Sequence, residues 1–162
     1  MSGNVYTAIF QDVEISAVQD LFELLVPSDA VVELLELSFG QSSIAADAGD
    51  AQEEFLLTTL RMVSGAPTSG SGGSTATPRP SNLGAVASGC TAEINNTTQL
   101  SGGTNVVLDV IPVNIRMPER KIDIPEGRYY FSPSIRLLWE LEDAPTDAVT
   151  CCGSIKWREL GG

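Results

Sequence analysis

Acidic side chains are the residues whose number and spacing could support chemistry in this sequence. The chain has 21 aspartates and glutamates, three cysteines and no histidine. Paired carboxylates at a suitable separation act as acid and base in glycoside hydrolases. Most of the acids here fall in expected loops or on exposed faces of expected strands, where solvation is the ordinary state of a carboxylate. Because Ser-His and Cys-His nucleophiles need histidine, we predict no catalytic residues and a protein that is not an enzyme.

Two segments bear on metal binding. Residues 47–54 place carboxylates around a glycine, as calcium ligands can be, but their spacing does not match an EF-hand and a solvated loop is favoured. Cys90, Cys151 and Cys152 lack the C-x-x-C spacing of zinc sites. We expect Cys90 and Cys151 to be small core side chains, and a disulfide between them stays open if their strands are neighbours. The sequence therefore predicts neither a metal nor a cofactor.

The charge balance restricts the partners of the chain. Its net charge is −12, and residues 1–64 hold eleven acids against the single base Arg61. Such a chain is repelled by nucleic acid and by anionic membranes, so we expect neither as a partner. A basic and aromatic cluster lies further on, and we interpret it as a contact with another protein. It contains Arg116, Arg120, Lys121, Arg128, Tyr129, Tyr130 and Phe131.

The elements that position these residues are expected to be strands. Short apolar segments rich in β-branched and aromatic residues alternate with turn residues, and none shows a convincing helical period. Residues 55–63 would also suit one face of a helix, but their threonines and valine favour a strand. The expected strands are 5–15, 19–26, 31–39, 55–63, 85–94, 104–115, 135–142 and 149–158, with a further short one at 121–124.

About eight strands without a helix predict an all-β fold, an antiparallel β-sandwich of jelly-roll type in a single domain spanning 1–162. In the last two strands apolar and polar residues alternate, so we expect Trp139 and Trp157 to point into the core. Pro112 predicts an edge position or a bulge for its strand, because proline cannot donate to a central ladder. Residues 95–98 (NNTT) are expected to form a turn.

One long segment of unusual composition interrupts the strands. Thirteen of the fifteen residues in 67–81 are Gly, Ser, Thr or Pro. We predict that 67–83 is an extended surface loop within the sandwich and that it contacts a partner. Deleting it is expected to leave the fold intact and to weaken assembly. The candidate contact residues in this loop are Thr68, Ser69, Gly70, Ser71, Pro78 and Arg79.

Several turn and loop segments resemble those of small virion proteins found among the head genes of tailed bacteriophages. They are QDLFEL at 19–24, GQSS at 40–43, DAGDA at 47–51, TSGSGGS at 68–74, NNTTQ at 95–99, SPS at 132–134, AP at 144–145 and GS at 153–154. The chain departs from the family pattern at 116–121 and at the Cys151-Cys152 pair.

This resemblance implies a head decoration (cement) protein that binds the major capsid protein on the outer surface of the capsid. It also implies a homo-oligomer, with a trimer favoured. No apolar run is long enough to cross a membrane and no signal pattern is visible, so we expect synthesis in the host cytoplasm. The alternative is a virion fibre, spike or adhesion module, in which Tyr129 and Tyr130 would contact a host receptor or glycan.

Overall fold

The computed structural model describes residues 3–42, 55–115, 117, 119–122 and 125–161. These residues form twelve strands and one short 3₁₀ helix, η2, at Pro125–Gly127. The strands are β1 (Asn4–Ile15), β2 (Gln19–Leu25), β3 (Ala30–Gln41), β4 (Phe55–Ser64), β5 (Ser74–Ala76), β6 (Arg79–Pro80), β7 (Thr91–Asn96), β8 (Thr104–Asn114), β9 (Glu119–Ile122), β10 (Tyr130–Phe131), β11 (Arg136–Leu141) and β12 (Val149–Gly161).

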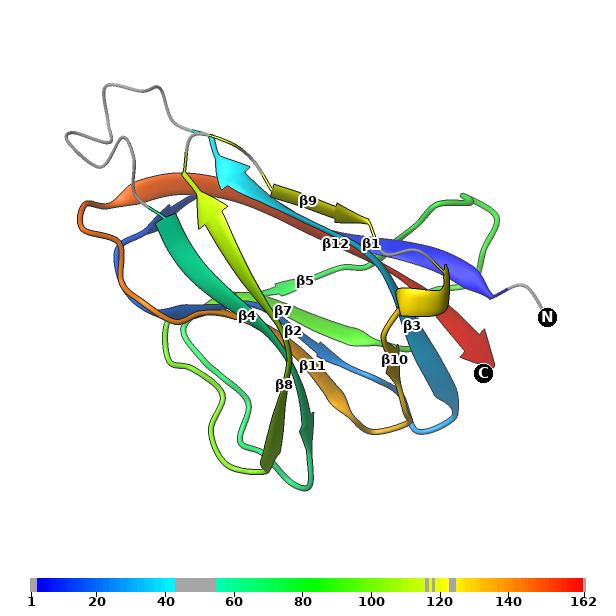
Figure 1. The fold of residues 1–162 in the computed structure, drawn as a ribbon. Coiled ribbons are helices and arrows are strands. Elements are labelled where there is room, and N and C mark those ends of the chain that lie inside the picture. Colours follow the sequence, from blue (N-terminus) through cyan, green and yellow to red (C-terminus); the bar gives the residue numbers. More distant parts are fainter. Residues whose placement is uncertain (1–2, 43–54, 116, 118, 123–124, 162) are drawn as a thin grey trace.

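The strands are arranged in two antiparallel sheets packed face to face (Figure 1). The first sheet has the order β10-β3-β12-β1-β6. β9 also pairs with β3, further along that strand than β10. The second has the order β5-β7-β2-β11-β4-β8. The expected all-β sandwich is confirmed. Its long strands correspond to the eight expected from the sequence, and the four short ones are β5, β6, β9 and β10.

An aromatic cluster joins the two sheets. Trp139 of β11 stacks on Phe22 of β2, with ring centroids 5.9 Å apart and planes 11° apart. From the opposite sheet, Phe39 meets Trp139 edge-on at 6.0 Å and Phe10 meets Phe22 at 5.3 Å. Such offset and edge-on pairs are favourable beyond the area that they bury. Trp139 and Trp157 are both fully buried, which confirms the inward positions expected from the alternation.

Most strand positions agree with the sequence, and the exceptions have local causes. Residues 55–63 form a strand, and Pro112 lies in β8 at the end of its sheet, as expected. The strand expected at 85–94 instead begins at Thr91, because residues 86–90 cross the end of β1 and β12. Asn95 and Asn96 belong to β7 and are buried, so the expected turn at 95–98 is wrong for these two. Asn95 has a φ of 55°, which asparagine tolerates better than most residues.

Residues 67–83 lie mostly at the surface, as expected, but they also contain two short strands that pair with both sheets. β5 pairs with β7, and β6 pairs with β1 at Tyr6 and Thr7. Isolated bridges also join Thr68 to Ser101 and Ser71 to Thr98. The segment therefore crosses from one sheet to the other and closes one side of the sandwich. Because this segment pairs with both sheets, its deletion is expected to destabilise the fold.

The cysteines act as packing residues. Cys90 and Cys151 are buried, as expected, and all three cysteines are free, so the disulfide left open by the sequence does not form here. Burial raises the pKa of the Cys151 thiol to about 12, with a smaller contribution from Cys152, and a thiol in that state is a poor nucleophile.

The close approach of Gly73 to β7 makes the order of this segment testable. A Cβ at Gly73 would lie 2.1 Å from the Ile94 carbonyl oxygen, whereas a Cβ at Gly84 would meet nothing closer than the Asn82 Oδ1 at 3.6 Å. We expect Gly73→Ala to lower the free energy of unfolding by roughly 1–3 kcal/mol, because it pushes β5 away from β7. Gly84→Ala is the matched control and should change it by less than about 0.5 kcal/mol. Urea denaturation measures both. Equal stabilities would show that 67–83 is a loose excursion after all.

Candidate functional site

Four carboxylates lie in the interior of the protein. Asp20 and Glu23 of β2, Glu33 of β3 and Glu140 of β11 are each at most 5% exposed. The expectation that the acids are solvated is therefore wrong for these four. Alternation along a strand predicts only which side chains share a face. It does not predict that loops and arginine side chains will cover the outer face and bury its acids. A buried carboxylate must find hydrogen-bond donors or a positive charge, so each one identifies a constructed polar site.

Glu23 holds the segment around Ser69 in place. Its carboxylate accepts a hydrogen bond from the Ser69 hydroxyl at 2.6 Å and another from the Gly70 backbone N–H at 3.0 Å. Arg136 of the neighbouring strand forms an ion pair with the same carboxylate and donates to the Ser69 hydroxyl at 3.0 Å. Ser69 and Gly70, both expected to contact a partner, thus make contacts inside the molecule, and Gly70 is buried.

Asp20 holds the loop at residues 98–101, which lies beside the segment around Ser69. One carboxylate oxygen accepts the Leu100 backbone N–H at 2.7 Å, and the other has no hydrogen-bond partner among the described residues. Burial raises the pKa of Asp20 to about 6, against the opposing effect of the Leu100 N–H. Residues 68–71 and 98–101 are joined to each other by two isolated bridges, and together they cover β2. Glu23 of β2 binds the first of these segments, and Asp20 of β2 binds the second.

Arg61 forms ion pairs with two further carboxylates, those of Glu140 and Glu142. Its Nε lies 2.6 Å from Glu140, and its Nη2 forms an ion pair with Glu142, which also accepts the Thr59 hydroxyl. Burial raises the pKa of Glu140 to about 7 although Arg61 opposes the shift. Burial alone would raise the pKa of Glu142 too, but hydrogen bonds from Thr59 and Arg61 hold it below its usual value. One arginine thus neutralises only part of the local negative charge.

Three of these acids are already engaged by other groups of the protein. Glu23, Glu140 and Glu142 already accept hydrogen bonds or ion pairs from protein groups, and Glu23 and Glu140 are buried. In the part of the chain that the structure describes, no three His, Cys, Asp or Glu side chains are grouped so that they could hold a metal ion. The calcium candidate at 47–54 lies outside the described residues.

Glu33 binds two residues of the basic and aromatic cluster, Arg128 and Tyr130. Arg128 and Arg158 donate to its carboxylate at 3.0 and 2.6 Å, and the Tyr130 hydroxyl does so at 3.2 Å. Burial opposes ionisation, but these donors hold the pKa of Glu33 below its usual value. Tyr129 is used differently, because its hydroxyl donates to the Leu108 carbonyl of β8 at 3.1 Å. These contacts tie β3, β8 and β10 together.

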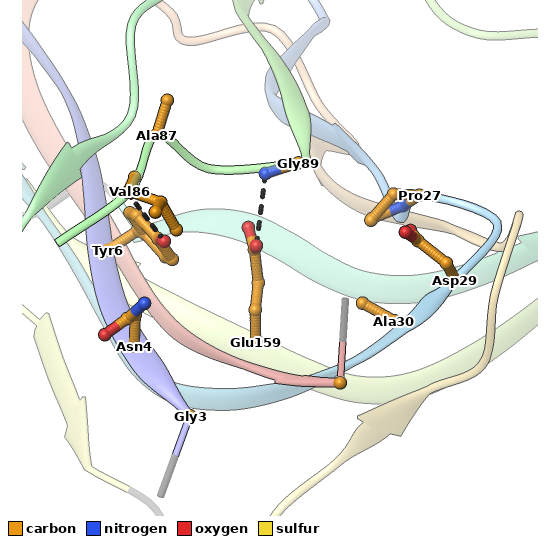
Figure 2. Close-up of a pocket in the computed structure, with 11 residues that line it drawn as sticks. Gly3, Asn4, Tyr6, Pro27, Asp29, Ala30, Val86, Ala87, Gly89 and Glu159 are labelled. Carbon is orange, nitrogen blue, oxygen red and sulfur yellow. Dashed lines mark hydrogen bonds between the residues drawn. The ribbon is translucent and has the colours of Figure 1, made fainter.

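A cavity of about 380 Å³ lies where the N-terminal end of β1 meets residues 86–89 (Figure 2). The Tyr6 hydroxyl donates to the Val86 carbonyl at 3.0 Å, and the Glu159 carboxylate accepts the Gly89 N–H at 3.1 Å. Glu159 also accepts hydrogen bonds from Ser88 and from the Cys90 N–H. The only carboxylate that Figure 2 shows hydrogen-bonded in the cavity therefore serves to hold the segment that forms one wall.

Besides Ile9 and Met117, large apolar side chains that the sequence did not single out are exposed in two groups. Leu83 is 98% exposed and Val86 is 72% exposed, at the end of the segment that follows β6. The second place is the β4–β8 margin of the second sheet, where the exposed residues are Phe55, Val106, Val107 and Val110. The available signals were an isolated leucine among turn residues and a strand that is apolar at successive positions. Exposed apolar groups of this kind are typical of protein-binding surfaces.

The structure does not bring the expected contact residues together. Thr68 and Ser71 lie over the second sheet, while Arg79 lies in β6 at one end of the first. Arg120 and Lys121 lie in β9, which pairs with β3 towards the other end of the first sheet. Pro78 is half-buried just before β6, and Arg116 lies outside the described residues.

Comparisons with known proteins assign no family. No family model matches the chain, and no curated protein matches it. One solved structure with a weak likeness is that of the infectious bursal disease virus Gx strain, at 16% identity and a TM-score of 0.23. The match covers 98% of this chain but only 41% of the viral chain. A likeness this weak carries no argument about fold or function. Separately, no helix among the described residues is long and apolar enough to span a membrane.

The buried Asp20 predicts a pH dependence of stability. Its pKa is raised in the folded state, so the fold binds more protons than the unfolded chain between about pH 4 and 6. The ionised side chain therefore lowers stability above pH 6, and that loss is relieved as the pH falls towards 4. We expect Asp20→Asn to raise the free energy of unfolding at pH 8 by about 1–2 kcal/mol and to change it little at pH 4.

Denaturation at several pH values measures this difference. Asp147→Asn, at an exposed carboxylate, is the matched control and should show no comparable pH-dependent gain. If Asp20→Asn is equally destabilising at pH 4 and pH 8, the side chain is held ionised in the fold and the interpretation of its environment is wrong.

Proposed function

We propose that this protein is a structural virion protein, a decoration (cement) protein that binds the outside of an assembled tailed-phage head and stabilises it. The observation that carries this proposal is the exposed apolar tip at residues 81–86, where Leu83 is 98% exposed. The resemblance of the turn and loop segments to phage head proteins supplies the context. The major capsid protein is the proposed partner, and the capsid surface is the proposed location.

The tip is held in a defined position by its base. The Ser81 N–H donates to the Val5 carbonyl of β1 at 2.8 Å, so the segment leaves the sheet at a fixed point. Within the tip, the Asn82 side chain accepts the Gly84 N–H at 3.0 Å and its carbonyl accepts the Ala85 N–H at 2.9 Å. The Tyr6 contact with Val86 ties the far side down. This is the green loop next to β1 in Figure 1.

A pre-positioned apolar tip suits insertion between capsid subunits. Burying one leucine side chain stabilises a complex by roughly 1.5–3 kcal/mol, and a few such anchors dominate most interfaces. Because the turn is already formed, less conformational entropy is lost on binding than for a disordered loop. The net charge of −12 favours a surface that carries basic residues and disfavours nucleic acid and anionic membrane.

A sedimentation assay tests the proposal. Undecorated, expanded heads of a tailed phage are mixed with the purified chain and pelleted. We expect the wild type to co-sediment, and Leu83→Asp to bind at least tenfold more weakly because a carboxylate cannot enter an apolar site. Leu83→Met is the control, since it keeps the apolar volume, and it should bind within about threefold of the wild type.

Two results would contradict the proposal. One is a wild-type protein that does not bind heads but does bind host cells, which would favour the fibre or adhesion alternative. The other is full binding by Leu83→Asp, which would remove the tip from the interface.

A further inference from the structure

The cavity of about 380 Å³ lies where β1 begins and β12 ends, between three walls (Figure 2). The start of β1 forms the first wall, the turn before β3 forms the second, and residues 86–89 form the third. Glu159 of β12 lies between them. Ligand sites in proteins span roughly 300–1,000 Å³, so this cavity has room for one long side chain of a partner rather than for a large cofactor.

The lining of the cavity combines carboxylates with apolar surface. Asp29 and Glu159 are its acids, and none of its eleven described lining residues is a lysine or an arginine. Pro27 and Val86 supply apolar surface beside these acids. Two carboxylates repel an anion, and Tyr6 is only 1% exposed, so its ring offers no open face on which a sugar could stack. The lining therefore suits a cation on an aliphatic stem, as in lysine and arginine.

The charge of Glu159 is not offset by a cation among the described residues. Its carboxylate accepts hydrogen bonds from four neutral donors, which are the Ser88 hydroxyl, the Gly89 and Cys90 N–H groups and the Trp157 indole N–H. Burial opposes ionisation, but these hydrogen bonds hold the pKa of Glu159 below its usual value. The cavity therefore holds a full negative charge at neutral pH.

Other carboxylates of this protein are neutralised from within. Glu23 forms an ion pair with Arg136, and Glu33 forms ion pairs with two arginines. Asp29, in contrast, is exposed and has no side-chain hydrogen bond or ion pair in the part of the chain that the structure describes. Asp29 and Glu159 thus leave two negative charges at one cavity for a group from outside the molecule.

We propose that this cavity receives a lysine or arginine side chain of the partner protein that the tip at residues 81–86 contacts. Val86 is 72% exposed and belongs both to the tip and to the cavity lining, so the two form one continuous surface. The cationic group would contact the Asp29 carboxylate and be attracted by Glu159, while its aliphatic stem packs on Pro27 and Val86. The inference deepens the proposed head binding and rests on it for the identity of the partner.

A titration with two small compounds tests the cavity by itself. N-acetyl-lysine methylamide carries an ammonium group, and N-acetyl-norleucine methylamide has the same four-carbon stem without it. We expect the lysine compound to shift the backbone amide NMR signals of Ala30, Val86 and Gly89, and the norleucine compound to shift them at least about fivefold less. Asp29→Asn should weaken binding of the lysine compound about threefold, as for an exposed ion pair. Asp147→Asn removes an exposed carboxylate just before the other end of β12, and it is the matched control that should bind like the wild type.

Sedimentation with heads tests the link to the partner. We expect Asp29→Asn to bind heads about threefold more weakly than Asp147→Asn, and the difference to shrink as NaCl is raised from about 50 to about 500 mM. Circular dichroism and melting curves confirm that both variants are folded.

The outcomes separate this inference from the proposed function. The cation site is overturned if the lysine compound causes no shifts at the cavity, if the norleucine compound causes equal ones, or if Asp29→Asn binds the lysine compound like the wild type. Equal head binding by Asp29→Asn and Asp147→Asn would remove the cavity from the contact with the partner. If the lysine compound binds but the wild-type chain does not bind heads, the proposed function fails and the cation site stands.

Discussion

The edges of a two-sheet sandwich expose backbone hydrogen-bonding groups, and the way this chain closes them governs the rest of its structure. Three of the four sheet ends are formed by short strands of two to four residues, with β9 and β10 both lying along β3. Two of these strands, β5 and β6, come from the Gly/Ser/Thr/Pro segment, which pairs with β7 on one sheet and β1 on the other. Only glycine at position 73 lets the chain approach the Ile94 carbonyl closely enough to do so. The segment therefore closes one side of the sandwich.

Buried carboxylates hold this arrangement in place. Glu23 fixes the segment at Ser69 and Gly70, and Asp20 fixes the neighbouring loop at Leu100. Glu33 binds Arg158 of β12 and Arg128, which lies just before β10. A buried acid without such partners would be strongly destabilising, so each carboxylate specifies which loop or strand must cover it. This gives the protein a polar framework outside its aromatic core. It also leaves the raised pKa values at Asp20 and Glu140, which belong to the framework and not to an exposed reaction centre.

The proposed function rests on apolar side chains that the fold leaves exposed to solvent. A loop that is tied down at both ends presents Leu83 to solvent, and a strand without an outer neighbour presents Val106 and Val107. These surfaces lie on opposite sides of the sandwich, so one copy can use both together. In the proposed arrangement the tip contacts the capsid. Rigid apolar contacts of this kind suit a protein whose work is to add interface to an assembly.

Local patterns in the sequence determined much of the fold, because they depend on residues close together in the chain. Alternation placed Trp139 and Trp157 in the core, and Pro112 marked the strand at the end of its sheet. The same reasoning predicted no strand within 67–83 and did not single out the four acids that are buried. Only tertiary structure could decide otherwise, since the partners of Glu23 lie 46 and 113 residues away at Ser69 and Arg136. The exposure of Leu83 was likewise decided by which strands became neighbours, a long-range outcome that no local spacing encodes.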